Sequence, residues 1–304
     1  MRYSNNNEEC GPRVDRVEPQ ESIQPSLEGF RPKFLNDLIR LGPPGDGGYV
    51  VNERLVFHSR YLMSFGVNDN WSFELAFLKR KPDVKIFCFD PSVSKDIFRK
   101  RMLNALNEVF SVKIVLLVLS FNLSSVRRKL SELRYWTKIY FAFSRFLARG
   151  NVRFHPIGIS NGNPSNFVTF AEAFLLISHE EIPENSVFVK MDIEQFEFRV
   201  LPDLLKLERY INGLVIEFHD LDILWDKFME LTQKLKAHFE ITHIHGNNWG
   251  GLIPNSEIPI LLEITFSKKS LIGEEHPARE TVTYPIPQLD CPNNRFARDY
   301  PLVF

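Results

Sequence analysis

The sequence has few cysteines and almost no net charge, and each shortage excludes a class of protein. Its three cysteines, Cys10, Cys88 and Cys291, lie far apart and form no Cys-x-x-Cys pair. This spacing argues against a thiolate zinc site and a disulfide framework, and it favours a reducing compartment. The 37 basic and 38 acidic residues give a net charge of −1, so no chain-wide field attracts nucleic acid. We therefore expect a cytoplasmic protein that does not bind nucleic acid.

The sequence also lacks a long apolar run. Residues 1–30 are polar and contain no apolar stretch of the kind found in a secretory leader, so we expect a poorly ordered tail. The most apolar run, Ile114–Leu119, extends loosely to Leu123. Ten helical residues rise only about 15 Å, against a hydrocarbon core of about 30 Å, so this run is too short to span a bilayer. Residues 31–304 are expected to form a single domain.

The central stretch of the chain is Val187–Glu194, an apolar run that ends in carboxylates. Its length, its valines and the helical pattern that follows are typical of a buried parallel strand. Asp192 and Glu194 then stand at the carboxyl end of that strand. Open α/β sheets bind their ligands at this edge, so we expect both acids in a binding site.

Two later runs repeat this design. Gly213–Asp220 ends in ionisable groups, and Phe239–Asn248 carries two histidines and an asparagine at alternate positions. Because side chains alternate along a strand, the polar groups of each run share one face. If the three strands are neighbours, four candidate catalytic residues meet at one edge of the sheet: Asp192, Glu217, His219 and His245.

A strand, a glycine turn and a second strand precede these runs. The first strand, Tyr61–Val67, contains Gly66, and the second, Val84–Pro91, carries Asp90 24 residues later. In a nucleotide-binding unit the glycine lets the ligand approach the backbone and the acid accepts hydrogen bonds from the ribose hydroxyls. A single glycine offers no cradle for a pyrophosphate. The pattern therefore favours a ligand with one nucleoside over NAD or FAD.

The loop Gly42–Gly48 contains four glycines and two prolines in seven positions. Such a loop turns sharply and either brings Asp46 near a ligand or is a plain turn before the short strand Tyr49–Val51. The residues before it, 34–41, have a pattern typical of a short helix.

The strand pattern is interrupted at residues 111–150, where eight basic residues accompany one acid, Glu132. Leucine and aromatic residues are interleaved with the basic ones, and we interpret the segment as a helical insertion within the domain. Its basic face is either a solvated helix surface, a cap over an anionic substrate, or a peripheral contact with anionic lipid.

Six motifs in the expected order resemble the FkbM-type methyltransferases, within the class I S-adenosyl-L-methionine-dependent methyltransferases. They are Asp46–Val50, Ser64–Glu74, Phe89–Asp90, Val189–Glu194, Val215–His219 and His243–Asn248. The resemblance covers about residues 34–304 outside the insertion. It implies an α/β fold: a Rossmann-like, doubly wound sheet, mostly parallel with an antiparallel last strand, plus the helical insertion.

The resemblance also implies S-adenosyl-L-methionine as the cofactor. Gly66 and its neighbours would face the methionine end and Asp90 the ribose, so the candidate cofactor-binding residues are Asp46, Ser64, Gly66, Asn68 and Asp90. Two positions depart from the family pattern. Asn68 replaces a second glycine and Gln195 replaces the glycine of Asp-x-Glu-Gly. Asparagine tolerates a positive φ better than glutamine does.

A hydroxyl acceptor for the methyl group needs a base. His219 and His245 are natural candidates because imidazole titrates near neutrality, with Asp192 or Glu217 as the orienting or alternative base. The expected site, at the ends of these three strands, is rich in hydrogen-bond acceptors and short of aromatic residues. It therefore favours a sugar or another hydroxylated small molecule or glycan as the methyl acceptor. Neighbouring carboxylates would repel unless a proton, a lysine, a histidine or a cation lies between them. A divalent cation is one of these options, and we assign no metal site.

Three other functions compete with this one. A nicotinamide-dependent oxidoreductase needs a glycine-rich turn that Asn68–Asn70 does not supply. A metal-dependent hydrolase would use the histidine and acid cluster. A binding protein of the same fold would have lost catalysis, and Gln195 is the one hint of this. The sequence does not indicate an oligomeric state.

Overall fold

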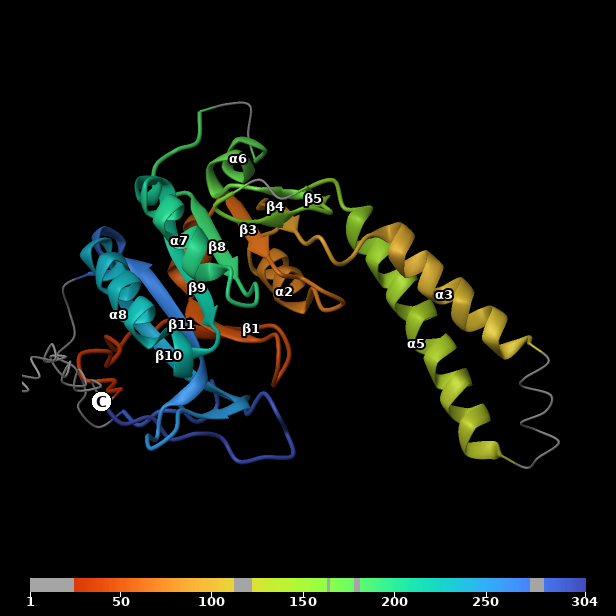
Figure 1. The fold of residues 1–304 in the computed structure, drawn as a ribbon. Coiled ribbons are helices and arrows are strands. Elements are labelled where there is room, and N and C mark those ends of the chain that lie inside the picture. Colours follow the sequence, from red (N-terminus) through yellow and green to blue (C-terminus); the bar gives the residue numbers. More distant parts are fainter. Residues whose placement is uncertain (1–24, 112–121, 163–164, 178–180, 274–281) are drawn as a thin grey trace, which may run out of the picture.

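The computed structural model describes residues 25–111, 122–162, 165–177, 181–273 and 282–304 (Figure 1). Most of the expected polar tail therefore lies outside the described residues, as does the apolar run Ile114–Leu119. None of the described helices is both long enough and apolar enough to cross a membrane.

A seven-stranded sheet forms the centre of the domain, in the order β10-β11-β9-β8-β3-β4-β5. The parallel part pairs β3 with β4 and β8, β4 with β5, and β8 with β9, whereas β11 runs antiparallel to both β9 and β10. The predicted fold, mostly parallel with an antiparallel last strand, is confirmed. The strands are β3 (Tyr61–Phe65), β4 (Lys85–Phe89), β5 (Val152–His155), β8 (Val187–Met191), β9 (Ile211–Phe218), β10 (Phe239–Leu252) and β11 (Pro259–Lys268).

Helices cover both faces of the sheet because the central strands are apolar on both sides. Along β8, Val187 and Val189 point into one core and Phe188 into the other. The first core is closed by α6 (Phe170–Leu175), α7 (Glu197–Leu205) and α8 (Leu221–His238). The second is closed by α1 (Glu53–His58) and α2 (Ser72–Arg80). The helices between β4 and β5 also contribute buried side chains to it. The sheet is thus doubly wound, as predicted.

The pattern at residues 34–41 predicts a helix, and this prediction is wrong. Leu38–Leu41 forms strand β1, which pairs antiparallel with β2 (Tyr49–Asn52) across the glycine loop. The positive φ of Gly42, +94°, lets the chain reverse there, and pairing with β2 then satisfies the backbone groups of β1. This hairpin carries Tyr49 to the carboxyl ends of β8 and β9. The small pair β6 (Gly158–Ile159) and β7 (Phe167–Val168) and the 3₁₀ turns η1 (Glu208–Tyr210) and η2 (Lys269–Leu271) complete the described elements.

Two long helices connect β4 to β5: α3 (Lys95–Val109) and α5 (Leu123–Leu147). They lie side by side and extend away from the edge of the sheet (Figure 1). Ser94 and Asn122 cap their N-termini through bonds from Ile97 N and Ser125 N. The basic segment expected at 111–150 therefore contributes α5, and its partner α3 comes from the residues just before it.

The strand order corrects one expectation about the site. The sequence suggests that the strands at 187, 213 and 239 are neighbours, but β11 lies between β9 and β10. In the register of these strands, His245 pairs with Glu263, and Glu263 pairs with Glu217. His245 is therefore two strand spacings, roughly 10 Å, away from Glu217.

Candidate active site

A polar cavity of about 540 Å³ opens at the carboxyl ends of β8 and β9. Asp192 and Glu194 enter it from the loop after β8, and Glu217 and His219 enter it from the end of β9. These are the positions that the strand patterns predict. Other lining residues come from the β1–β2 loop, the loop after β3 and β10, among them Asp46, Gly66, Asn68, Asn247 and Trp249.

His219 is the most constrained group in this cavity. Its backbone N–H and its Nδ1 both meet Oε1 of the buried Glu197, at 2.8 and 3.1 Å. Nε2 therefore faces the cavity, 3.7 Å from Asp192 Oδ1 and 3.9 Å from Glu217 Oε1. Burial lowers the pKa of His219, but the bond to Glu197 and the nearby carboxylates outweigh it and raise the pKa to about 9. The imidazole is accordingly charged at neutral pH.

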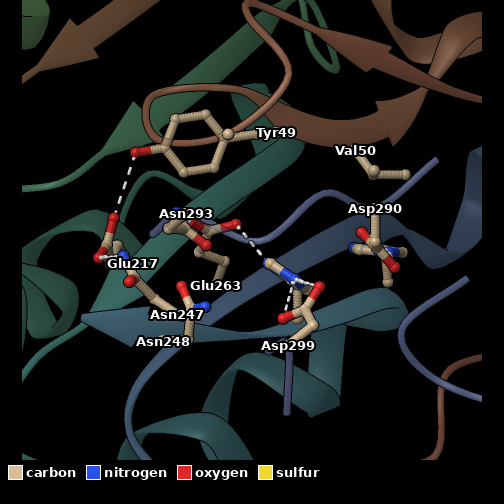
Figure 2. Close-up of polar contacts among 12 residues, drawn as sticks. Tyr49, Val50, Glu217, Asn247, Asn248, Glu263, Asp290, Asn293 and Asp299 are labelled. Atoms are coloured by element: carbon tan, nitrogen blue, oxygen red, sulfur yellow. Dashed lines mark hydrogen bonds and ion pairs between the residues drawn. The ribbon is translucent and has the colours of Figure 1, made fainter. Parts of the chain in front are cut away.

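The two carboxylates opposite His219 share a hydroxyl donor. Tyr49 Oη lies 3.0 Å from Asp192 Oδ2 and 3.3 Å from Glu217 Oε2, and one O–H can donate to only one of them at a time. Asn247 Nδ2 donates to Glu217 Oε1 at 2.7 Å. Figure 2 shows Tyr49 and Asn247 on either side of the Glu217 carboxylate. Burial and the charge of Asp192 raise the pKa of Glu217 well above its usual range.

Lys190 supplies the neutralising charge that adjacent carboxylates require. Its Nζ lies 3.4 Å from Asp192 Oδ2 and also donates to the carbonyl of Gly66. Burial lowers the pKa of Lys190, but Asp192 and Glu74 more than compensate, so the pKa rises and the ammonium stays charged. The lysine and the imidazolium of His219 thus both lie beside Asp192.

Three of these residues could hold a metal ion. Asp192, Glu217 and His219 each offer a ligand atom, and these atoms lie within 4.8 Å of one another. Lys190 and Tyr49 already bind the same carboxylates, so a divalent cation would compete with them. His245 is not part of this group.

His245 lies outside the cavity, so the expectation that it joins the other three residues is wrong. Its Nδ1 is 3.3 Å from Glu263 Oε2, and its Nε2 is 3.1 Å from both oxygens of Asp299. The side chain is 1 % exposed. Burial lowers the pKa of His245, but the bonds to Asp299 and Glu263 raise it to about 10. The neighbouring His243 meets Asp290 in the same way, with Nε2 3.1 Å from the carboxylate.

A second cavity, of about 300 Å³, adjoins the first. Its walls are mostly apolar and include Phe89, Ile159, Phe167 and Phe196. It shares four residues with the polar cavity: Gly66, Asn68, Asp192 and Glu194. The two spaces are therefore adjacent pockets on either side of the loops that follow β3 and β8.

Asp90 lines the apolar cavity at the end of β4, where the sequence places it. Its Oδ2 accepts hydrogen bonds from Val67 N at 2.9 Å and Asn68 N at 2.7 Å. Its Oδ1 accepts two bonds from Ser92, from the backbone N at 2.8 Å and from Oγ at 2.6 Å. Asp90 thus holds the glycine turn in place, and the Ser92 hydroxyl is the one donor to it that can rotate away.

Residues with positive φ shape both the glycine turn after β3 and the loop after β8. Gly66 has φ +74°, and a Cβ there would lie 1.6 Å from the carbonyl oxygen of Asp192, so the residue is required for packing as well as for ligand approach. Asn68 adopts φ 47°, as its tolerance of positive φ predicts. Gln195 also adopts a positive φ, 75°, and its amide donates to Asp220. The glutamine therefore accepts the glycine conformation, with a side-chain bond to hold it.

The remaining cofactor candidates differ in position. Asp46 lines the polar cavity, whereas Ser64 is buried beneath it and donates to Glu74. Glu74 lines the cavity instead, and its Oε2 has no hydrogen-bond partner among the described residues. Sequence reasoning missed Glu74, Tyr49, Glu197 and Trp249. Tyr49 lies within the motif Asp46–Val50 and Glu74 within the motif Ser64–Glu74, so these two motifs were the available signal.

No protein-family model matches the chain, and no curated protein matches it significantly. The precorrin-6y C5,15-methyltransferase of Geobacter metallireducens GS-15 is a similar solved structure, with 11 % identity, a TM-score of 0.34, and coverage of 71 % of this chain and 86 % of that one. The fibrillarin pre-rRNA processing protein of Methanococcus jannaschii has 10 % identity, a TM-score of 0.34, and coverage of 78 % and 84 %. The plantazolicin methyltransferase BpumL, in complex with SAH, has 10 % identity, a TM-score of 0.32, and coverage of 71 % and 82 %. Likenesses this low carry no argument about function. The chain's own strand order, with β11 antiparallel between β9 and β10, is that of the class I methyltransferase fold.

Proposed function

We propose that this chain is an S-adenosyl-L-methionine-dependent methyltransferase that methylates a hydroxyl group of a sugar or another hydroxylated small molecule or glycan. The observation that carries the proposal is the pair of adjoining cavities, one apolar and aromatic, the other lined by carboxylates. A ligand that combines a flat base, a ribose and a cationic amino acid fits such a pair. The resemblance of six sequence motifs to FkbM-type methyltransferases supports the same assignment.

The residues present fit this cofactor. Phe89, Phe167 and Phe196 offer apolar surface for an adenine. Asp90 lines the same cavity, where a ribose hydroxyl would replace the Ser92 hydroxyl. On the other side, Glu74 has a buried oxygen without a partner among the described residues, which suits an ammonium donor. When bound, the cofactor supplies a methyl group on a positively charged sulfur. The carboxylates of Asp46, Asp192 and Glu74 favour that charge.

His219 is the residue best placed to take the proton of an acceptor hydroxyl. Glu197 fixes Nδ1, so Nε2 points toward the cavity where an acceptor enters. In the free protein its raised pKa keeps Nε2 protonated at neutral pH. A cationic ligand placed among the same carboxylates lowers the pKa of His219, because like charges disfavour each other. Asp192, at the junction of the two cavities, is the alternative base.

The wall of the polar cavity supports a hydroxylated acceptor. Trp249 is 60 % exposed and lines this cavity, as do Asn247 and Glu217. An exposed indole can cover the apolar face of a sugar ring while amide and carboxylate groups bind its hydroxyls. Buried polar groups reject a ligand that leaves them unpaired, so a purely apolar acceptor fits this cavity poorly. A cytoplasmic location, proposed from the low cysteine content, suits both cofactor and acceptor.

Isothermal titration calorimetry with S-adenosylhomocysteine and NAD in parallel tests the proposal. We expect binding of the first and none of the second. Asp90→Ala should weaken S-adenosylhomocysteine binding by at least about 1.5 kcal/mol, the scale of a hydrogen bond to a charged group. Asp96→Ala, at an exposed acid on α3, is the matched control and should bind normally. Binding of NAD alone, or unchanged affinity in Asp90→Ala, would contradict the proposal.

If the protein is instead a metal-dependent hydrolase, its activity should depend on a metal ion and not on the cofactor. Because Asp192, Glu217 and His219 could hold a cation, that function would be lost to a chelator and indifferent to S-adenosylmethionine. Assays of the purified protein with and without EDTA, and with and without the cofactor, separate the two functions.

A further inference from the structure

Four basic side chains form a row along the outer face of α5: Arg127, Arg134, Lys138 and Arg145. Their spacings of seven, four and seven residues return to the same side of an α-helix. All four are exposed, and none forms an ion pair with another residue in the described part of the chain. The row is therefore a surface with unsatisfied positive charge.

The row faces away from the partner helix. The inner face of α5 is marked by Trp136, Phe143 and Phe146, which pack against α3 and the sheet edge. At about 100° per residue, Trp136 and Phe143 lie on the opposite side of the helix from Arg127 and Arg134, and Phe146 lies about a third of a turn away from them. The contacts between α3 and α5 use other basic residues: Lys129 with Glu108, and Arg101 over the ring of Trp136. The four residues of the row are thus not needed to join the two helices.

Exposed apolar side chains run beside the basic row. Leu123, Leu130 and Phe141 are 54 %, 38 % and 58 % exposed, and the helical period places them within about a sixth of a turn of the row. The face is therefore amphipathic rather than purely polar. Basic residues next to alkyl and phenyl groups are what a helix lying in the plane of a membrane interface presents.

Positive charge is concentrated in the two helices α3 and α5. Helices α3 and α5 contain ten basic and three acidic residues, a net charge of +7, whereas the whole chain carries −1. Figure 1 shows the two helices extending away from the sheet, so this positive charge is carried by a projecting part of the fold. We propose that the outer face of α5 binds an anionic lipid surface and anchors the domain there peripherally.

Lipid suits this face better than nucleic acid. Two of the three apolar residues beside the row are leucines, which gain by entering hydrocarbon but give a base little to stack on. The outer face of α5 is also a strip about 37 Å long, the length of a helix of 25 residues. Proteins that bind single-stranded nucleic acid instead present a groove that follows the nucleic-acid backbone. Anionic headgroups would meet the four cations while the leucines and Phe141 enter the interface.

Vesicle flotation tests this proposal. The wild-type chain should float with vesicles of phosphatidylcholine and phosphatidylserine but not with phosphatidylcholine alone, and less well as salt increases. Charge reversal of the row (R127E, R134E, K138E, R145E) should reduce partitioning about 100-fold or more, because each basic residue near the surface contributes severalfold. A second variant replaces the same four residues by glutamine, which removes their charge without reversing it. This variant should also lose most of the binding to vesicles. Circular dichroism of both variants shows whether they are folded.

The matched control reverses four exposed lysines outside the two helices: Lys79, Lys206, Lys227 and Lys234. It changes the net charge equally and should lower partitioning only a few-fold, since charges beyond a Debye length of about 8 Å are screened. L130S with F141S should weaken the binding that persists in high salt. Equal loss in the control and row variants would overturn the proposal. So would binding of single-stranded RNA without binding of anionic vesicles.

Discussion

His219 and His245 occupy similar charge environments in two different parts of the molecule. Each imidazole lies between carboxylates, and each pKa is raised, to about 9 for His219 and about 10 for His245. His219 has one ring nitrogen bound by Glu197 and the other facing a cavity. His245 has both nitrogens bound by acids, Glu263 and Asp299. A charged histidine among acids is therefore no evidence of catalysis unless one ring nitrogen remains available to a ligand.

The two histidine sites belong to one row of buried polar groups. Glu217, Glu263 and His245 are in register across β9, β11 and β10, so their side chains share a face. Asn293 from the C-terminal segment donates to Glu263 Oε1 at 2.6 Å. Figure 2 draws both residues in the same group of side chains as Asp299. The positive charge of His245 balances Glu263 within this row. We infer that the His245 site stabilises the fold while the His219 site carries the chemistry.

The largest expected effect is on turnover, and it follows removal of the imidazole that faces the cavity. His219→Ala should lower turnover by about 10²-fold to 10³-fold, the contribution of a general base, and keep S-adenosylhomocysteine affinity within about twofold. Steady-state kinetics with calorimetry measure both. The exposed His238→Ala is the control and should behave as wild type. Normal turnover in His219→Ala would leave Asp192 as the base.

The second effect is on stability. His245→Ala leaves Glu263 and Asp299 buried beside each other without a cation, so the free energy of unfolding should fall by about 3 kcal/mol. Urea denaturation measures it, and turnover per folded molecule should stay at the wild-type level. A variant that is stable but inactive would instead place His245 in the reaction.

The third effect is a pH dependence with a defined sign. The unfolded pKa of histidine is about 6.5, and the folded pKa of His245 is about 10. Its stabilising contribution is therefore complete below about pH 6.5 and is lost as the pH rises toward 10. Urea denaturation across this range should show wild-type stability falling more steeply than that of His245→Ala. Parallel curves for the two proteins would contradict the charged state of His245.

The positions of Asp192, Glu217 and His219 were predictable because they follow local rules. Each apolar run ends in ionisable residues, and parallel strands share one carboxyl edge. The position of His245 was not, because it depends on β11 inserting between β9 and β10. That pairing joins residues distant in sequence, and no local pattern in Phe239–Asn248 indicates it.

The partners of both histidines also escaped prediction. Glu197 lies on α7, where an acid in the first turn is normally a solvated residue. Asp299, which binds His245, and Asp290, which binds the neighbouring His243, come from a proline-containing segment, yet the side chains of both are largely buried. Their burial follows from the way this segment covers β10, through contacts such as Asn248 Nδ2 with the carbonyl of Asn294. Only the tertiary structure brings these acids to the imidazoles.

The smallest effect should come from Tyr49→Phe, which alters the first site and leaves the second intact. The change removes the hydroxyl between Asp192 and Glu217, but the ring keeps its edge-to-face contact with Phe73, 5.6 Å between centroids. The backbone is also held, since Thr265 Oγ1 donates to the carbonyl of Val50. We expect turnover to fall by about tenfold, the equivalent of one hydrogen bond to a charged group, with unchanged cofactor affinity. The part of the stability loss between pH 6.5 and about 10 that His245 contributes should remain, because Tyr49→Phe leaves Glu263 and Asp299 in place around it. If Tyr49→Phe also flattened that pH dependence, the two histidine sites would be coupled through the carboxylate row rather than independent.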